Sequence, residues 1–364
     1  MPSNRRSRPH VQSNSEPSPD RTGTEPSPRD ASLPAGSAER MRALRDRVNA
    51  DLRAAVADRG PDVLYDPIRY VLDGDGKRIR PVLLLLVAHA MGVTVKRAMP
   101  AALAVEVFHN FTLVHDDIMD GSDERRGRPT VHTATDRGWE TSTAILAGDM
   151  MMGLSYELLG TLDAAVDLRR VQDAFYPMVE RLCAGQALDE ALEEAESVSV
   201  DDYLQMIDGK TVALFATVFE IGAILGGASD EGRRRLRTAG RDLGRGFQIQ
   251  DDLLDLVGDQ TKTGKPVGGD LVNGKKTYVT LAALEAADGD RRAWLRGLLE
   301  KPELSASEID EVRDWMQAAG VFDRTRETFR SYFASAREGL TILPDNASRK
   351  TLHHVIDYTQ NRSR

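Results

Sequence analysis

Two acidic clusters within apolar helical segments constrain the fold of this 364-residue chain more than any other feature. Both have the spacing DDxxD: Asp116, Asp117 and Asp120 form the first cluster, and Asp251, Asp252 and Asp255 form the second. A helix advances about 100° per residue, so the first and last aspartates of a cluster lie about 40° apart and can bind the same ions. Such oxygen-rich clusters suit magnesium, which completes its shell with water and substrate phosphates.

A single cluster of this kind is more often a solvated helix end than a metal site. A second copy at the same spacing favours the metal site, because its apolar neighbours, such as Leu253 and Leu254, draw these helices into a core. Unpaired carboxylates are costly there. We therefore expect the two clusters to face each other across a cavity and to hold divalent ions and, through them, one diphosphate.

Helical periodicity begins near Ala38 and continues almost to the C-terminus, with short Gly, Pro or Asp interruptions. Alternating strands and hairpin signals are not evident, so the predicted fold class is all-α. Residues 1–36 are rich in Ser, Pro, Arg and Asp and hold few large apolar side chains, which predicts a disordered tail. Residues 37–364 are predicted to form one all-α domain.

Composition excludes several classes of protein. The net charge of -9 argues against a general nucleic-acid binder, although local Lys/Arg clusters and bound metal can still attract anionic substrates. Cys183 is the single cysteine, so an intrachain disulfide is impossible, and we expect it to be a small core residue. No apolar run has the length of a transmembrane segment or the pattern of a signal peptide. These features predict a cytoplasmic protein.

Basic residues and one histidine are placed to bind anions. Lys77 and Arg80 lie in a glycine-containing loop, Leu72 to Pro81, before a helix expected to start at Pro81, where free backbone N–H groups add to the attraction. His109 lies on the same helical face as the first acidic cluster, two turns deeper. A core histidine is the ordinary alternative, and the alignment with the aspartates favours a donor to a second anion.

Further motifs follow along the chain. Lys210 and Thr211 lie at a helix irregularity that leads into a strongly apolar segment. This segment could form the wall of an apolar tunnel. Lys265 and Lys275 lie in a loop broken by Gly and Pro, which could close over a diphosphate and screen it from water. The part of the chain after Ala286 offers no chemical motif and is predicted to be scaffold.

These motifs together resemble those of the trans-isoprenyl diphosphate synthases in the polyprenyl synthetase family. Five elements occur in order: GKRIRP, HDDIMDGSDERRGRPTVH, the GQ and KT pairs, FQIQDDLLD, and GKPVGGDLVNGKKT. The resemblance extends from about Leu44 to the end of the chain. Asp75 departs from it, because the family usually has glycine before GKR, and we expect only a small loop change there.

The resemblance implies an antiparallel helix bundle around a deep central cavity, paired as a homodimer. It implies condensation of isopentenyl diphosphate with an allylic diphosphate (dimethylallyl, geranyl or farnesyl), with about three magnesium ions per active site. Asp116, Asp120 and Asp251 would bind the ions, supported by Asp117, Asp252 and Asp255. Arg125, Lys210, Lys265 and Lys275 would hold the allylic diphosphate, and Lys77, Arg80, His109 and Arg126 would hold isopentenyl diphosphate.

The chemistry requires stabilisation of a departing diphosphate and of an allylic cation, and needs no protein nucleophile. The Thr211 hydroxyl and the Gln248 amide could stabilise the allylic cation. In this family an aromatic residue five positions before the first aspartate closes the tunnel, and here that residue is Phe111. Phe108 lies near it, and Thr112 is too small to shorten the product further.

This pattern resembles enzymes that make the C20 product, geranylgeranyl diphosphate, although a helical wheel places Phe111 to one side of the aspartate face. A C15 farnesyl product remains an alternative. A class I terpene cyclase and a non-catalytic subunit of a heteromeric synthase are less favoured, because both acidic clusters are intact and a cyclase needs no second diphosphate site.

Overall fold

The computed structural model describes residues 36–74, 76–258, 268–301 and 303–362. Three parts of the sequence predictions lie outside the described residues. They are the predicted tail except Gly36, the departure from the family pattern at Asp75, and the predicted ligand Lys265. The described residues belong to one compact unit.

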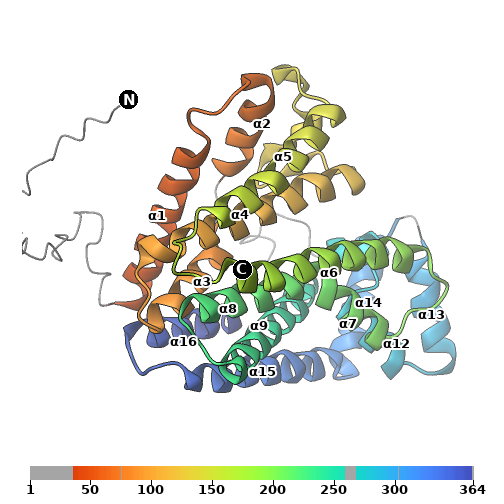
Figure 1. The fold of residues 1–364 in the computed structure, drawn as a ribbon. Coiled ribbons are helices and arrows are strands. Elements are labelled where there is room, and N and C mark those ends of the chain that lie inside the picture. The colour runs from red at the N-terminus through yellow and green to blue at the C-terminus, as the bar shows by residue number, and fades with distance from the viewer. Residues whose placement is uncertain (1–35, 75, 259–267, 302, 363–364) are drawn as a thin grey trace, which may run out of the picture. The chain divides into compact units, whose positions relative to one another are not determined.

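The described part of the chain is built from α-helices (Figure 1). In order they are α1 (Ser37–Val56), α2 (Asp62–Leu72), α3 (Ile79–Ala90), α4 (Val95–Met119), α5 (Thr141–Gly160), α6 (Leu168–Glu194), α7 (Val200–Ile207), α8 (Ala213–Leu225), α9 (Asp230–Val257), α11 (Gly269–Val272), α12 (Tyr278–Ala286), α13 (Gly289–Leu299), α14 (Ala306–Ala318), α15 (Val321–Gly339) and α16 (Ala347–Gln360). A π-helical segment, Asp208–Val212, joins α7 to α8. A hairpin of two short strands, β1 (Glu124–Arg125) and β2 (Arg128–Pro129), follows α4, and the predicted all-α class is confirmed.

Helix α8 lies at the centre of the packing, because its sequence is apolar on every side and almost all of its residues are buried. Helices α3, α4, α6 and α9 pack around it. Glycines let backbones approach closely: a Cβ at Gly222 would lie 2.8 Å from Val87 of α3, and one at Gly240 of α9 would lie 2.6 Å from the Phe215 carbonyl. The segment that the sequence marks as apolar is therefore a buried helix that forms the inner wall of the bundle.

The predicted start of the third helix is wrong by two residues. Helix α3 begins at Ile79, because Arg78 adopts a left-handed conformation (φ 47°) that ends the preceding loop. Pro81 still lies in the first turn, where its missing N–H costs no intrahelical hydrogen bond.

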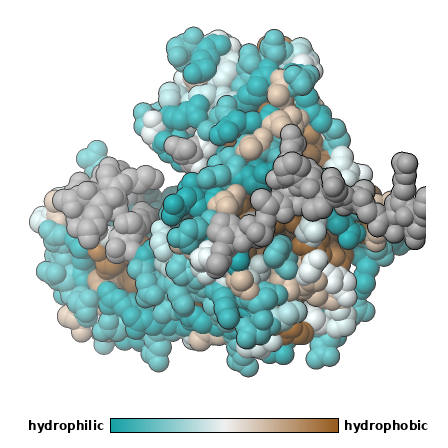
Figure 2. All heavy atoms as spheres, turned by 90° about the vertical axis from the view of Figure 1, so that its left-hand side faces the viewer, coloured by the Kyte–Doolittle hydropathy of each residue, from teal (hydrophilic) through white to brown (hydrophobic). Residues whose placement is uncertain are grey.

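Two helices near the C-terminus pack against this bundle. α15 packs along α9, and α16 packs against α3 and α1. None of the described helices is both long enough and apolar enough to span a membrane. The face that Figure 2 shows is largely hydrophilic, with smaller hydrophobic areas between the polar ones.

Candidate active site

Helices α4 and α9 bring residues of both acidic clusters to one cavity of about 230 Å³, which Asp117, Asp251 and Asp255 do not line. Asp116 and Asp120 line it from α4, and Asp252 lines it from α9. Its wall also carries the positive charges of Lys210, Lys276 and the exposed Lys275, and the further carboxylates of Asp189, Glu193 and Asp270. Residues far apart in the sequence thus form one pocket that is lined by both carboxylates and amines.

The three aspartates of the first cluster point in two different directions from α4. Asp116 and Asp120 face the cavity, and Asp117 turns away and is buried, where its Oδ1 accepts a hydrogen bond of 2.7 Å from Arg125 Nε. Burial raises the pKa of Asp117 although the Arg125 hydrogen bond opposes it. Burial, together with the neighbouring Asp116 carboxylate, also raises the pKa of Asp120.

The second cluster is held by hydrogen bonds from several elements. Asp252 accepts from Tyr203 Oη at 2.5 Å, from Gln248 Nε2 at 3.1 Å and from the Tyr278 backbone N–H at 3.1 Å. Burial raises its pKa to about 7 in spite of these donors. Tyr203 and Tyr278 come from α7 and α12, so Asp252 ties the second cluster to both helices.

The other two aspartates of α9 have different partners. Asp251 Oδ1 lies 2.8 Å from Arg362 Nη2, close to the end of the chain. Asp255 Oδ2 accepts the Asp270 N–H at 2.9 Å, which fixes the start of α11 beside α9.

Carboxylate oxygens on two sides of the cavity fit a hard divalent cation, which prefers oxygen donors together with water and substrate phosphates. Asp116 Oδ1 is buried and accepts no hydrogen bond of good geometry. Over the ranges that the structure describes, no three acidic, histidine or cysteine side chains stand close enough to hold one ion by themselves.

Lys210 reaches the cavity from the π-helical segment, at the helix irregularity that the sequence predicts. Its Nζ lies 3.2 Å from Asp116 Oδ1 and 2.5 Å from Asp189 Oδ2. Burial lowers the pKa of Lys210, but the two carboxylates outweigh burial and leave the pKa above its ordinary value. Next to it, Thr211 Oγ1 donates to Gln248 Oε1 at 3.2 Å.

A group of basic residues lies close to Asp116 of the first acidic cluster. Arg80 Nη1 lies 3.1 Å from His109 Nε2, and the charges of Arg125 and Arg126 act on the same histidine. Burial lowers the pKa of Arg80 to about 10, and burial with the neighbouring Arg80 lowers the pKa of His109 well below its ordinary value. His109 is therefore neutral at pH 7 and accepts from Arg80, which leaves its Nδ1–H as a donor. Lys77, three residues before Arg80 in the sequence, is exposed.

Arg78 anchors the loop that carries Lys77 and Arg80. Its buried guanidinium donates to Glu106 Oε1 at 2.7 Å on α4 and to Asn49 Oδ1 at 2.8 Å on α1. The same side chain also donates to the carbonyls of Leu72 and Gly74. This network gives the basic loop a fixed position relative to α4.

An apolar pocket of about 480 Å³ continues from the charged cavity, and Asp116, Lys210 and Thr211 line both. Phe111 and Thr112 line its wall, so Phe111 reaches the pocket although the helical wheel placed it to one side. The Phe111 ring lies edge to face with Phe108, at 5.2 Å between centroids. Phe108 is fully buried behind Phe111 and does not line the pocket.

Several residues near the site were not predicted as functional. Arg362, Tyr203 and Asp189 all contact predicted site residues, and no short motif marks them. The expectation that Cys183 lies in the core was wrong: it is exposed on α6 at the rim of the apolar pocket.

Comparisons with known proteins agree with this geometry. Residues 61–316 match the family model described as polyprenyl synthetase. The chain is 37% identical to a geranylgeranyl diphosphate synthase of Methanosarcina mazei over 83% of this chain and 90% of that protein. It is also 37% identical to a geranylfarnesyl diphosphate synthase of Natronomonas pharaonis, over 88% and 96%.

A solved structure extends the likeness to the fold. A crystal structure of geranylgeranyl pyrophosphate synthase from Corynebacterium glutamicum, complexed with isoprenyl diphosphate and magnesium, superposes with a TM-score of 0.76 at 31% identity. The match covers 88% of this chain and 98% of that one. The chain therefore belongs to the polyprenyl synthetase family of prenyltransferases.

Proposed function

We propose that the chain catalyses the magnesium-dependent, head-to-tail condensation of isopentenyl diphosphate with an allylic diphosphate, and that its main product is C20 geranylgeranyl diphosphate. The observation that carries this proposal is the meeting of Asp116 and Asp120 with Asp252 around a cavity that continues into an apolar pocket. Family membership supports the reaction, and the relatives named for the C20 product support the chain length.

We propose that Asp116, Asp120 and Asp251 bind the magnesium ions, about three per active site, with Asp117, Asp252 and Asp255 supporting them. Bound magnesium would stabilise the negative charge that develops on the departing diphosphate. The hydrogen bonds that hold Asp117 and Asp252 fit a supporting role, because they orient these carboxylates from behind.

The cationic side chains divide between two substrates. Arg125, Lys210 and Lys275 are proposed to hold the allylic diphosphate, as is Lys265, which lies outside the described residues. Lys77, Arg80, His109 and Arg126 are proposed to hold isopentenyl diphosphate. The positive charge of Lys210 is secured by its raised pKa, and the neutral His109 acts as a hydrogen-bond donor.

Side chains inside the cavity and the apolar pocket are proposed to stabilise the allylic cation and to exclude water. Thr211 and Gln248 form a hydrogen-bonded pair next to Lys210, and their oxygen dipoles can face an allylic cation. The departing diphosphate is the proposed base for the last proton. Phe111, with Phe108 behind it, is the proposed floor that ends chain growth at C20, and the small Thr112 leaves room above it.

We also propose a homodimer. Met119, Ile145, Leu146 and Tyr176 are exposed on α4, α5 and α6, with exposed fractions between 43% and 63%. Large apolar side chains that are exposed on these helices favour a buried interface. Sedimentation equilibrium should give about twice the chain mass, and a monomer at micromolar concentration would contradict the proposal.

The proposed function is tested by incubating the purified full chain with Mg²⁺, isopentenyl diphosphate and labelled dimethylallyl, geranyl or farnesyl diphosphate. Mass analysis should show mainly C20 product, and Asp116→Asn should abolish it. A product that stops at C15 or continues past C20 would contradict the chain length. Absence of condensation, or a cyclic hydrocarbon formed from geranylgeranyl diphosphate alone, would contradict the function.

A further inference from the structure

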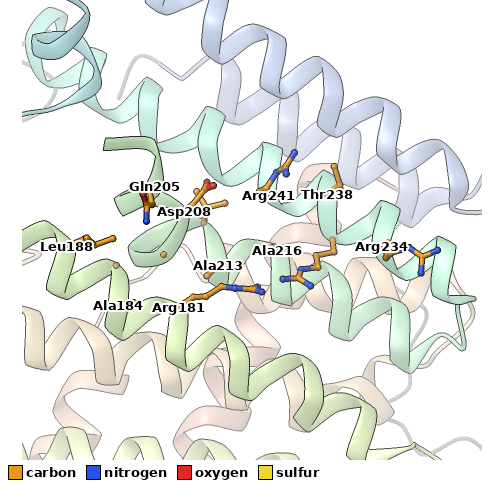
Figure 3. A pocket seen from close by; sticks show the side chains of 14 residues that line it. Arg181, Ala184, Leu188, Gln205, Asp208, Ala213, Ala216, Arg234, Thr238 and Arg241 are labelled. Atoms are coloured by element: carbon orange, nitrogen blue, oxygen red, sulfur yellow. The ribbon is translucent and has the colours of Figure 1, made fainter. Parts of the chain in front are cut away.

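A second cavity, of about 540 Å³, lies on the other side of the π-helical segment from the candidate active site. We call it the arginine groove. Figure 3 shows Arg181 rising from α6, while Arg234 and Arg241 come from α9, with Ala213 and Ala216 between the two helices. The groove is lined by Arg181, Ala184, Gly185, Leu188, Gln205, Asp208, Gly209, Val212, Ala213, Ala216, Arg234, Arg237, Thr238 and Arg241.

The walls of the arginine groove carry excess positive charge. Asp208 is its one acidic lining residue, and both oxygens of Asp208 accept from Arg245, at 2.7 and 2.5 Å. Arg181 and Arg234 are exposed and have no ion pair among the described residues. In a chain of net charge -9, this concentration of cationic side chains attracts an anion.

The remaining two arginines are only partly neutralised. Arg237 Nε lies 3.4 Å from Glu220, and Arg241 Nη2 lies 3.1 Å from its neighbour in sequence, the buried Asp242. Their side chains keep 38% and 47% exposure, so both still present N–H donors to the groove. Arginine presents these donors in a planar fork that matches phosphate oxygens.

The floor of the arginine groove is apolar. Ala184 and Leu188 of α6, Val212, and Ala213 and Ala216 of α8 contribute no side-chain donor or acceptor. A groove of this size exceeds the volume of a single phosphate group, and its apolar floor can cover a short hydrocarbon chain. Together, the cationic rim and the apolar floor match an amphiphile with an anionic head.

The wall between the arginine groove and the active site is a single stretch of backbone. Within the π-helical segment, Asp208, Gly209 and Val212 line the groove, and Lys210 and Thr211 line the catalytic cavities. π-helical turns of this kind occur often at functional sites.

Helix α6 presses directly on this wall. A Cβ at Gly209 would lie 2.5 Å from the Arg181 carbonyl oxygen, and one at Gly185 would lie 2.1 Å from the Lys210 backbone nitrogen. The backbone that carries Arg181 is therefore in contact with the backbone that carries Lys210. A ligand that draws Arg181 inward changes the packing against the segment that positions Lys210.

We propose that the arginine groove is a second, non-catalytic binding site for a phosphorylated amphiphile, that is, a phosphate or diphosphate head on a short apolar chain. Its occupation alters the turnover number through the π-helical segment. This inference goes beyond the condensation reaction, and its binding test does not require activity.

The binding test is calorimetric titration of the full chain with octyl phosphate in EDTA, which removes divalent metal. The test variant is Arg181→Gln/Arg234→Gln, and the matched control is Arg169→Gln/Arg330→Gln, which changes two exposed arginines that do not line the groove. We expect saturable binding at one site per chain by the wild type and the control. Loss of two charge-assisted contacts should weaken binding by the test variant at least about tenfold.

Equal affinity of the test variant and the control would overturn the proposal. Inorganic phosphate is the second probe, and it should bind much more weakly than octyl phosphate, because it leaves the apolar floor uncovered. Equal affinity for the two probes would overturn the assignment to an amphiphile.

The coupling test measures initial rates with Mg²⁺ and both substrates at increasing octyl phosphate. Octyl phosphate should change the apparent kcat of the wild type and the control, and leave that of the test variant unchanged. Purely competitive inhibition that is equal in all three proteins would locate octyl phosphate in the catalytic cavity and overturn the coupling.

Discussion

Neutralising Glu106 should weaken both the fold and the binding of one substrate. Glu106 is 2% exposed, and its Oε1 accepts from Arg78 at 2.7 Å and from Asn110 Nδ2 at 3.2 Å. Removing one charge of a buried ion pair costs about 3–5 kcal/mol. In Glu106→Gln, Arg78 keeps neutral acceptors on Asn49 and two carbonyls, so we expect the lower end of that range, about 3 kcal/mol.

The kinetic consequence should be selective. Arg78 fixes the loop that carries Lys77 and Arg80, which are proposed ligands of isopentenyl diphosphate. A less ordered loop that weakens the binding free energy of isopentenyl diphosphate by about 1.4 kcal/mol would raise its KM about tenfold. The KM for the allylic substrate should stay within about twofold, because Lys210 and Asp116 do not contact this network.

The assay combines urea unfolding with steady-state kinetics in which each substrate is varied in turn. Glu311→Gln is the matched control, because Glu311 is exposed and forms a surface ion pair with Arg291 at 3.4 Å. Such a pair contributes about 0–1 kcal/mol. A Glu106→Gln protein that loses less than about 1 kcal/mol and keeps both KM values would refute this reasoning.

Three further predictions concern the tunnel, the histidine and the chain end. Phe111→Ala should lengthen the product beyond C20, and unchanged length would place the tunnel floor elsewhere. The native pKa of His109 lies below its ordinary value, so the unfolded state binds more protons as the pH falls below about 6.5, and stability should fall there by up to about 1.4 kcal/mol per pH unit. His109→Gln should flatten the unfolding free energy between pH 6.5 and 5, and parallel curves would refute this. Arg362→Gln removes the cation 2.8 Å from Asp251 and should lower the Mg²⁺ concentration for half-maximal rate. An unchanged or higher Mg²⁺ requirement would contradict it.

Local spacing predicted much of the fold. Apolar periodicity predicted the all-α class, because each helix buries a face or, for α8, almost its whole surface. The DDxxD spacing placed Asp116 and Asp120 on one helical face, and both line the same cavity.

The partners of these residues could not be predicted in the same way. Tyr203 reaches Asp252 from α7, and Arg362 reaches Asp251 from the end of the chain, in a region interpreted as scaffold. Helical periodicity indicates which face is buried, but not which distant helix covers it. Phe111 shows the same limit, since its place in the pocket depends on how α4 packs against α6 and α8.

The central proposal is that two acidic clusters on α4 and α9 bind metal together with a diphosphate. It is tested most directly by Mn²⁺ binding to the full chain, followed by electron paramagnetic resonance with and without inorganic diphosphate. We predict that diphosphate increases binding to about three ions per chain, and that Asp116→Asn and Asp251→Asn each abolish the increase. Binding that does not depend on diphosphate, or that survives loss of either aspartate, would contradict the proposal.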